Sequence, residues 1–179
     1  PPRSTQGVSS AASDVYKRQL TNVGMHAMNS LRIEKAYRHW GHDIADEDTP
    51  IEAGLEFAVR FDKPGGFIGR EALLRQKESG LVAKRMVQFL MEDPEVMLYH
   101  NEPIIRDGTI CGYISSGMYG HTLGGSVGMG YVNNPLERGG VDSEYVNSGS
   151  YEIEVACKRY PAQASLEPLY DPGNERIKS

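Results

Sequence analysis

Glycine is concentrated in one part of this chain. Of its 20 glycines, eight fall in one window of 23 residues. Glycine alone takes a positive φ angle without steric cost. A density of this kind therefore predicts short strands joined by tight turns. The eight positions are Gly108, Gly112, Gly117, Gly120, Gly124, Gly125, Gly128 and Gly130.

The hydrophobic pattern around this window also indicates strands. After residue 80, apolar and polar residues alternate with a period of two. The dipeptide DG at 107–108 separates two of these runs and is a strong hairpin-turn signal. Several short strands separated by turn signals are typical of a small barrel or sandwich. The expected strands cover 85–91, 103–106, 109–115, 126–132 and 150–156.

Before residue 80 the pattern is mixed. Residues 24–37 predict a helix that passes into a strand near Leu31. Residues 55–61, LEFAVRF, alternate and predict a half-buried strand. Residues 69–80 predict a helix with Leu73 and Leu74 facing inward and a glycine at its end. The chain is thus expected to be an α/β segment followed by an all-β domain.

Composition excludes several functions. The net charge of −5 argues against nucleic acid as the main partner, since backbone phosphates need a basic face. No run of about 18 apolar residues occurs, so no membrane span is expected. Two cysteines cannot form a zinc cluster or a disulfide framework, which fits a reducing cytosol or organelle matrix. Cys111 lies among apolar strand residues and is expected to be a buried, unreactive thiol.

Several catalytic and cofactor motifs are not completed. The segment GMGYVN does not complete the dinucleotide fingerprint GxGxxG, and no Walker loop occurs. The serine pair at 115–116 lacks the flanking glycines of a nucleophile elbow. His39 and His42 have the spacing of a helical metal pair, but Gly41 between them favours a loop and no third ligand is obvious. Two surface histidines, and no metal site, are therefore expected.

Arg32 is the strongest single candidate for a functional residue. On a helix it shares a face with Met25 and Met28, so its guanidinium approaches apolar surface. A desolvated arginine needs a carboxylate or a similar anion as partner. The alternatives are a structural pair with a protein carboxylate and the binding of an anionic ligand.

Three other residues lie in loops that can carry binding groups. Trp40, the only tryptophan, lies in the polar segment HWGHD, where it can stack on a flat ligand or cover the core. Tyr119 and His121 lie on the glycine-framed run SGMYGHTLG. Loops on a rigid β scaffold commonly carry binding groups, although composition alone indicates a turn-rich connection.

Several motifs, taken in order, resemble the aminomethyltransferase family, which includes the T-protein of the glycine cleavage system. They are SLRIEKAYRHWGHDI at 30–44, DTPIEAGLEFAVRFDK at 48–63, FIGREALLRQK at 67–77 and LYHNEPIIRDGTICGYISSGMYGHTLGGSVGMGYV at 98–132. Within the family, EKAYRHWG and the tail AQASLEPLYDPGNERIK at 162–178 resemble sarcosine and dimethylglycine dehydrogenases more than T-proteins. The resemblance covers residues 20–179.

The resemblance implies an α+β, mostly β fold. A partial α/β folate-binding lobe would span residues 20–79, and a small antiparallel β-barrel of Greek-key or jelly-roll type would span 80–179. Since part of the folate lobe would lie upstream, apolar faces of 20–79 are expected to be partly uncovered. The barrel should be the better-packed unit, because about 100 residues can support a core.

The resemblance also implies a function. In these dehydrogenases an N-terminal FAD domain oxidises an N-methyl amine such as sarcosine or dimethylglycine. A C-terminal tetrahydrofolate domain captures the one-carbon unit as 5,10-methylene-tetrahydrofolate. Folate and the FAD domain of the same protein would be the partners of this chain, in the bacterial cytoplasm or the mitochondrial matrix. Because the family's catalytic aspartate would lie upstream, this chain alone is expected to be inactive.

Carried over by position, the resemblance assigns binding roles and no catalytic residue. Arg32 matches the arginine of the SLR motif, which contacts folate in the family. Trp40 stands where many T-proteins carry a tyrosine close to the pterin. Tyr119 and His121 match a dehydrogenase-type YGHTL run that would face the ligand or the FAD domain. T-proteins often have an arginine near position 99, where this chain has the pair YH, so polyglutamate contacts are in doubt there.

Two alternative functions stay open, and so does the status of the first residues. The chain could belong to a free-standing T-protein-like aminomethyltransferase, or it could be a non-catalytic folate-binding or docking module. An FAD fingerprint upstream would separate the dehydrogenase from both. Residues 9–19, SSAASDVYKRQ, resemble a translated sequencing adapter, with a disordered tail over 1–19 as the alternative. If it is an adapter, the natural sequence begins near Leu20.

Overall fold

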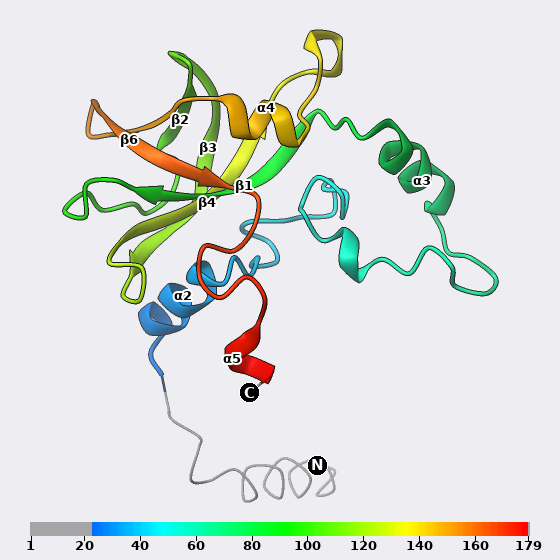
Figure 1. Ribbon diagram of the computed structural model, residues 1–179, viewed down its shortest axis with the longest axis horizontal. Coiled ribbons are helices and arrows are strands. Elements are labelled where there is room, and N and C mark those ends of the chain that lie inside the picture. The colour runs from blue at the N-terminus through cyan, green and yellow to red at the C-terminus, as the bar shows by residue number, and fades with distance from the viewer. Residues whose placement is uncertain (1–22, 179) are drawn as a thin grey trace, which may run out of the picture.

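The computed structural model describes residues 23–178 and is dominated by one β-barrel (Figure 1). The adapter-like run at 9–19 and the expected start near Leu20 lie outside the described residues. The helices are α2 (Met25–Glu34), α3 (Arg70–Ser79), α4 (Ser143–Ser148) and α5 (Glu175–Lys178), with single-turn helices at Glu56–Ala58 and Leu136–Arg138. The strands are β1 (Lys84–Met91), β2 (Pro103–Arg106), β3 (Thr109–Gly120), β4 (Gly125–Asn133), β5 (Tyr151–Val155) and β6 (Lys158–Ser165).

The six strands form a closed barrel in the order β1-β4-β3-β2-β5-β6, and every neighbouring pair is antiparallel. Strands β2, β3 and β4 follow one another, and β1 lies beside β4, which is a Greek-key arrangement. The interior is filled by apolar side chains that are fully buried, among them Phe89, Ile104, Ile114 and Ile153. The predicted mostly-β fold with a small antiparallel barrel is confirmed.

The barrel contains one strand that the sequence pattern did not predict. Strand β6 closes the barrel between β5 and β1, and it contains Pro161. Proline is unusual inside a strand because it has no N–H to donate. Its carbonyl nevertheless accepts a hydrogen bond from the N–H of Glu92 at 3.1 Å. A proline inside a run of residues weakens the local signal for a strand.

The glycine window has a second cause besides turns. Of its eight glycines, only Gly108 (φ 82°) and Gly124 (φ 76°) have a positive φ angle. Gly112 lies within β3, where a Cβ atom would come within 1.9 Å of the Tyr131 carbonyl oxygen. A Cβ on Gly130 would lie 2.3 Å from the carbonyl oxygen of Tyr113. The prediction of turns is therefore right at Gly108 and Gly124. It is wrong at Gly112 and Gly130, where the backbone of the neighbouring strand leaves no room for a side chain.

Two expectations for the first part of the chain are wrong. Helix α2 continues to Glu34 and does not pass into a strand near Leu31. The segment LEFAVRF forms a single 3₁₀ turn at Glu56–Ala58 with no buried residue, and Phe57 is 85% exposed. A half-buried strand needs a neighbouring strand for its backbone groups, and no described strand pairs with this segment. Its amides instead bond locally, from Ala58 to the Leu55 carbonyl at 3.0 Å.

Two side chains, Gln88 and Lys35, fix the end of α2 to the barrel and to the C-terminal segment. Gln88 of β1 donates to the carbonyls of Ile33 and Glu34, and it accepts from the N–H of Leu169. Lys35 is 8% exposed, and its ammonium donates to the Asp171 carbonyl and to Asn174. Buried polar groups that are satisfied in this way hold a single arrangement. Helix α2 is therefore a fixed wall at this end of the barrel.

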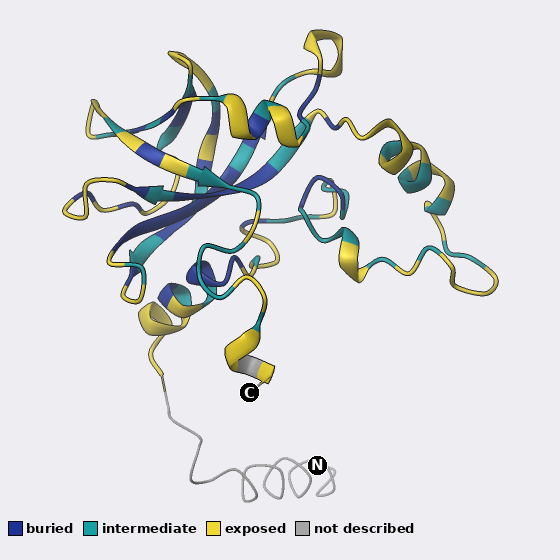
Figure 2. Ribbon diagram, in the orientation of Figure 1, coloured by how far each residue is buried: buried dark blue, intermediate teal, exposed yellow. Residues whose placement is uncertain are grey.

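Burial is uneven along the chain, as Figure 2 shows. The barrel strands carry most of the buried residues, whereas α3 has none, and Leu73 and Leu74 are only half-buried. Met25 and Leu31 of α2 are 68% and 57% exposed. We expect the amide hydrogens of α3 to exchange with solvent at least about 100-fold faster than those of β4, because few apolar contacts oppose local opening. Hydrogen exchange measured by mass spectrometry checks this, and equal protection in α3 and β4 would contradict it.

Candidate functional site

A hollow of about 290 Å³ lies between α2, the loop that follows it and strand β3. Helix α2 contributes both apolar and polar side chains to its walls, and the loops contribute histidines and a tyrosine. Arg32 lies on the same helix face as Met25 and Met28 and lines this hollow with them, as its helical spacing predicted. The lining residues are Met25, Met28, Asn29, Arg32, Ile33, His39, His42, Tyr99, His100, Ser116, Gly117 and Met118.

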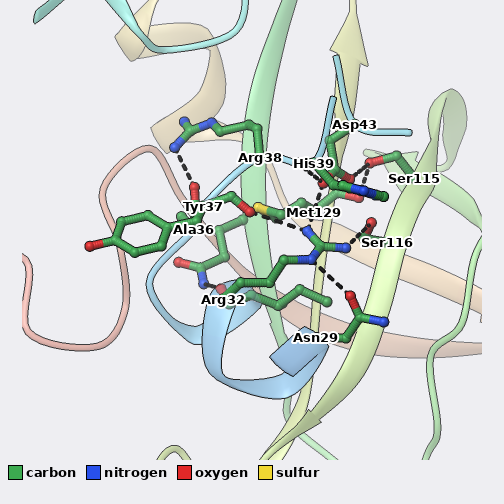
Figure 3. A network of polar contacts seen from close by, with 12 residues as sticks. Asn29, Arg32, Ala36, Tyr37, Arg38, His39, Asp43, Ser115, Ser116 and Met129 are labelled. Carbon is green, nitrogen blue, oxygen red and sulfur yellow. Dashed lines mark hydrogen bonds and ion pairs between the residues drawn. The ribbon is translucent and has the colours of Figure 1, made fainter. Parts of the chain in front are cut away.

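The guanidinium of Arg32 is the centre of the polar network in Figure 3. Its Nε donates to Asn29 Oδ1 at 2.9 Å, and one terminal nitrogen donates to the Tyr37 carbonyl. The same nitrogen donates to Asp43 Oδ2 at 2.7 Å, while the other donates to Ser116 Oγ at 2.9 Å. Four of the five guanidinium N–H groups thus have protein acceptors. The side chain is 13% exposed, so it lies at the floor of the hollow.

Asp43 is the carboxylate that Arg32 needs. Its side chain is fully buried and accepts from Ser115 Oγ at 2.6 Å and from the N–H of His39 at 2.8 Å. Burial acts to raise the pKa of Asp43, but the hydrogen bonds from Ser115, Ser116 and His39 and the charge of Arg32 outweigh it. The pKa of Asp43 therefore lies below its ordinary value of 3.8. The structural alternative for Arg32 is realised, with a partner from the following loop.

Because the pKa of Asp43 is lowered in the folded state, the free energy of unfolding should depend on pH in the acid range. A carboxyl whose pKa is lower in the folded state stabilises that state above its unfolded pKa, and this contribution is lost as pH falls through the folded pKa. We expect the free energy of unfolding to fall below about pH 4 more steeply in the natural chain than in Asp43→Asn. Urea unfolding at stepped pH measures the difference. Parallel curves would contradict the prediction, and some slope should persist because the pKa of Asp48 is lowered too.

Sequence reasoning found Arg32 but missed the groups that hold it. Asp43, Ser115 and Ser116 were not selected as site residues. Asp43 is part of the segment HWGHD, so a desolvated arginine followed by a loop carboxylate was the available signal. Nothing in the local pattern of β3 distinguishes the two serines from other strand positions, because their role depends on the packing of α2 against β3.

The other predicted site residues lie outside the lining of this hollow. Tyr119 and His121 lie at the end of β3 with their rings edge to face, 5.1 Å apart. Buried Glu34 fixes the adjoining turn by accepting from the N–H groups of Thr122 and Leu123. Trp40 is 67% exposed and does not cover the core of the described chain. The structure thus groups only one of the four candidates with the hollow, and it places an aromatic pair on a fixed turn.

Cys111 is less buried than the sequence predicts. The thiol is half-buried and lies 3.5 Å from the carbonyl oxygen of Ile104, to which it donates. Burial raises the pKa of Cys111 to about 11. At neutral pH the side chain is therefore a neutral thiol, which is a poor nucleophile.

Residues 23–178 contain neither a metal-site arrangement nor a membrane-spanning helix. No group of three or more His, Cys, Asp or Glu in that range has the arrangement of a metal site. In the same range, no helix has the length and the apolar character that crossing a membrane requires.

Two family models match the chain. Residues 84–171 match the glycine cleavage T-protein C-terminal barrel domain, and residues 12–63 match the GCVT N-terminal domain. The chain belongs to the glycine cleavage T-protein family. The crystal structure of glycine cleavage system aminomethyltransferase T from Bartonella henselae has the same fold, with a TM-score of 0.72 and 24% identity. That similarity covers 93% of this chain and 45% of the solved one.

The chain is also similar to parts of much longer proteins. It is 40% identical over 158 residues to 4-methylaminobutanoate oxidase (formaldehyde-forming) of Paenarthrobacter nicotinovorans, which is 87% of this chain and 18% of that protein. It is 40% identical over 162 residues to human mitochondrial sarcosine dehydrogenase, 90% and 17% respectively. It is 40% identical over 161 residues to the mouse mitochondrial pyruvate dehydrogenase phosphatase regulatory subunit, 86% and 18%. The chain therefore spans less than a fifth of these relatives.

Proposed function

We propose that this chain is the tetrahydrofolate-binding, C-terminal part of a flavin-dependent N-methyl amine dehydrogenase. The observation that carries the proposal is the hollow floored by Arg32, on a chain whose similarity to sarcosine dehydrogenase extends over 90% of its length. The whole protein would oxidise an N-methyl amine on an upstream FAD domain and transfer the released one-carbon unit to tetrahydrofolate. The location would be the bacterial cytoplasm or the mitochondrial matrix.

The residues around the hollow fit one end of a folate. Met25 and Met28 offer a polarisable apolar wall for a flat ring. The remaining N–H of Arg32 and the amide of Asn29 are polar groups that could orient it. A volume of about 290 Å³ is at the lower end for a ligand pocket. Upstream polypeptide, resting on the exposed apolar face of α2, would supply the remaining walls.

Arg32 would then orient the ligand and not merely attract it. Because four of its N–H groups are held by protein acceptors, the guanidinium plane has one orientation before any ligand arrives. Such preorganisation lowers the entropic cost of binding. The proposed reaction also needs a carboxylate near the transferred carbon and a chamber that keeps water out. Both would come from the upstream lobe, so this chain alone should bind folate and form no 5,10-methylene-tetrahydrofolate.

Replacing Arg32 by lysine tests the proposed binding role. Lysine keeps the charge but loses the planar fork, so we expect the affinity of the 179-residue chain for tetrahydrofolate to fall at least about tenfold. Isothermal titration calorimetry under anaerobic conditions measures the affinity. Arg60→Lys is the matched control, since Arg60 pairs with Asp62 on the surface. Equal affinity in the Arg32→Lys variant, with its fold retained, would contradict the role.

A docking module without turnover is the second candidate. The observation that favours it is the regulatory subunit of a phosphatase, which is as similar to this chain as the oxidoreductases are. Measuring tetrahydrofolate binding by the natural chain separates the two candidate functions if no binding is found. A folded chain that binds no tetrahydrofolate would favour a docking role and count against the dehydrogenase.

A further inference from the structure

A second hollow lies where the C-terminal segment passes beside the loop that follows α2. Its volume is about 500 Å³, and it shares no lining residue with the hollow floored by Arg32. Its walls come from the segments 35–44, 54–57 and 166–174, and they are mostly apolar. The larger apolar side chains in its lining are Ile44, Leu55, Phe57, Leu166, Pro168 and Pro172.

Arg38 is a half-buried cation in the wall of this second hollow. Its Nε donates to the Ala53 carbonyl at 3.0 Å, and its Nη1 donates to the Ala36 carbonyl (Figure 3). Both acceptors are neutral, and within the described part of the chain Arg38 forms no ion pair with a carboxylate. Burial lowers the pKa of Arg38, yet an arginine stays charged in proteins. Its charge is therefore partly removed from water without a counter-ion.

Gly54 leaves a space beside this guanidinium. A Cβ atom on Gly54 would lie 2.8 Å from Nη2 of Arg38, and Nη2 donates to no acceptor among residues 23–178. A charge-assisted N–H···O hydrogen bond is about 2.7–2.9 Å long, so an oxygen of a bound molecule fits at this position. Both residues line the second hollow, so the space opens toward its apolar walls.

The other charges around the second hollow leave Arg38 as its one uncompensated cation. The ammonium of Lys35 already donates to the carbonyl and the carboxylate of Asp171 and to the side chain of Asn174. Glu167 is the only acidic residue in the lining, and it is exposed to solvent. A negative group that enters the hollow would thus meet an open donor at Arg38.

An apolar cavity with one open cation fits a molecule that has an apolar body and a single negative charge. Ligand pockets commonly have volumes of about 300–1,000 Å³, with mostly apolar walls and a few polar groups that fix orientation. A carboxylate matches the planar guanidinium in geometry and in charge. A phosphate group carries up to about two negative charges at neutral pH, so one open cation would leave part of its charge unpaired.

We propose that the second hollow binds an apolar monocarboxylate, with Arg38 Nη2 donating to the carboxylate and Leu55 and Phe57 against the apolar body. The site does not rest on the proposed function, because its residues are separate from those around Arg32. Phe57 is 85% exposed, so a bound apolar body would remove part of its ring from water. The proposal thus gives a role to an aromatic ring that packing within the described chain does not use.

The test titrates octanoate and its uncharged analogue octanamide into the 179-residue chain by calorimetry. We expect one octanoate per chain, bound at least about tenfold more tightly than octanamide, because only the carboxylate pairs with the guanidinium. Arg38→Gln should lower the affinity for octanoate at least about tenfold and change that for octanamide by less than about twofold. Arg60→Gln is the matched control, since Arg60 pairs with Asp62 on the surface. The comparison with octanamide tests the charge should Arg38→Gln not fold.

A second pair of variants tests the apolar wall. Phe57→Ser should lower the affinity for octanoate and for octanamide by at least about threefold each, because both lose apolar area that binding would bury. The exposure of Phe57 makes a loss of folding unexpected in this variant. Leu31→Ser is the matched control, because Leu31 is 57% exposed on α2 and does not line the second hollow.

Four results would overturn the proposal. They are the absence of saturable octanoate binding, octanamide binding as tightly as octanoate, octanoate affinity unchanged in folded Arg38→Gln, and an affinity that falls in Leu31→Ser but not in Phe57→Ser. The first result would leave a carboxylate of another polypeptide segment as the counter-ion of Arg38. The last would place the apolar body on the exposed face of α2.

Discussion

Replacing Asp43 by asparagine is expected to lower the free energy of unfolding by about 3–5 kcal/mol at neutral pH, because it removes one partner of a buried ion pair. The Arg32 guanidinium would keep its place at 13% exposure without the charge that balances it. Ser115 and the His39 N–H would lose an anionic acceptor at the same time. Urea unfolding followed by circular dichroism measures the loss, provided the transition is two-state.

The control for this experiment is Asp62→Asn. Asp62 pairs with Arg60, and the two side chains are 79% and 74% exposed. Exposed pairs contribute little, so the control should change stability by less than about 1 kcal/mol. A loss in Asp43→Asn as small as in the control would mean that the pair with Arg32 does not hold the site together. In that case the guanidinium is free to turn toward a ligand.

Gly112→Ala is expected to destabilise the barrel by about 3 kcal/mol or to prevent folding. The added Cβ would stand 1.9 Å from the carbonyl oxygen of Tyr131, which belongs to the backbone of the neighbouring strand β4. Overpacking typically costs about 1–3 kcal/mol, and this position is at the upper end because no flexible side chain can move away. The same urea measurement applies.

Gly24→Ala is the matched control for the glycine experiment. Gly24 has a φ angle of −77°, and a Cβ there would meet nothing within 4 Å. Its loss should stay below about 1 kcal/mol, since glycine is only a moderate N-cap residue. If Gly112→Ala costs no more than this control, the two strands can separate at this point without penalty, and close approach is not why glycine stands there.

The sequence predicted the barrel well and the surrounding segments poorly. Alternation of apolar and polar residues is a local signal, and strand β2 was predicted at its observed bounds, Pro103–Arg106. The same signal failed in LEFAVRF, because alternation cannot report whether a neighbouring strand exists. The same signal did not predict β6. This strand contains Pro161, and it forms because its backbone pairs with β1 and β5. The local pattern shows that a segment is able to form a strand, but whether it does so depends on a neighbouring strand to pair with.

The candidate site divides in the same way. Arg32 was predicted from its helical spacing to Met25 and Met28 and from the SLR motif. These signals could be read because the residues that carry them lie within ten positions of Arg32. Its partners come from the loop after α2 and from β3, and His100 joins His39 and His42 from a distant turn. Trp40, Tyr119 and His121 were predicted as binding residues, and a ligand role for them is still a prediction.

The sequence by itself determined that residues after 80 form a β domain and that Arg32 lies on a helix face with Met25 and Met28. It did so because periodicity, turn residues and hydrophobicity act between near neighbours along the chain. Only the tertiary structure decided which carboxylate pairs with Arg32, which strand closes the barrel and which histidines meet. These depend on contacts between residues far apart in sequence, where burial and close approach select one partner among many.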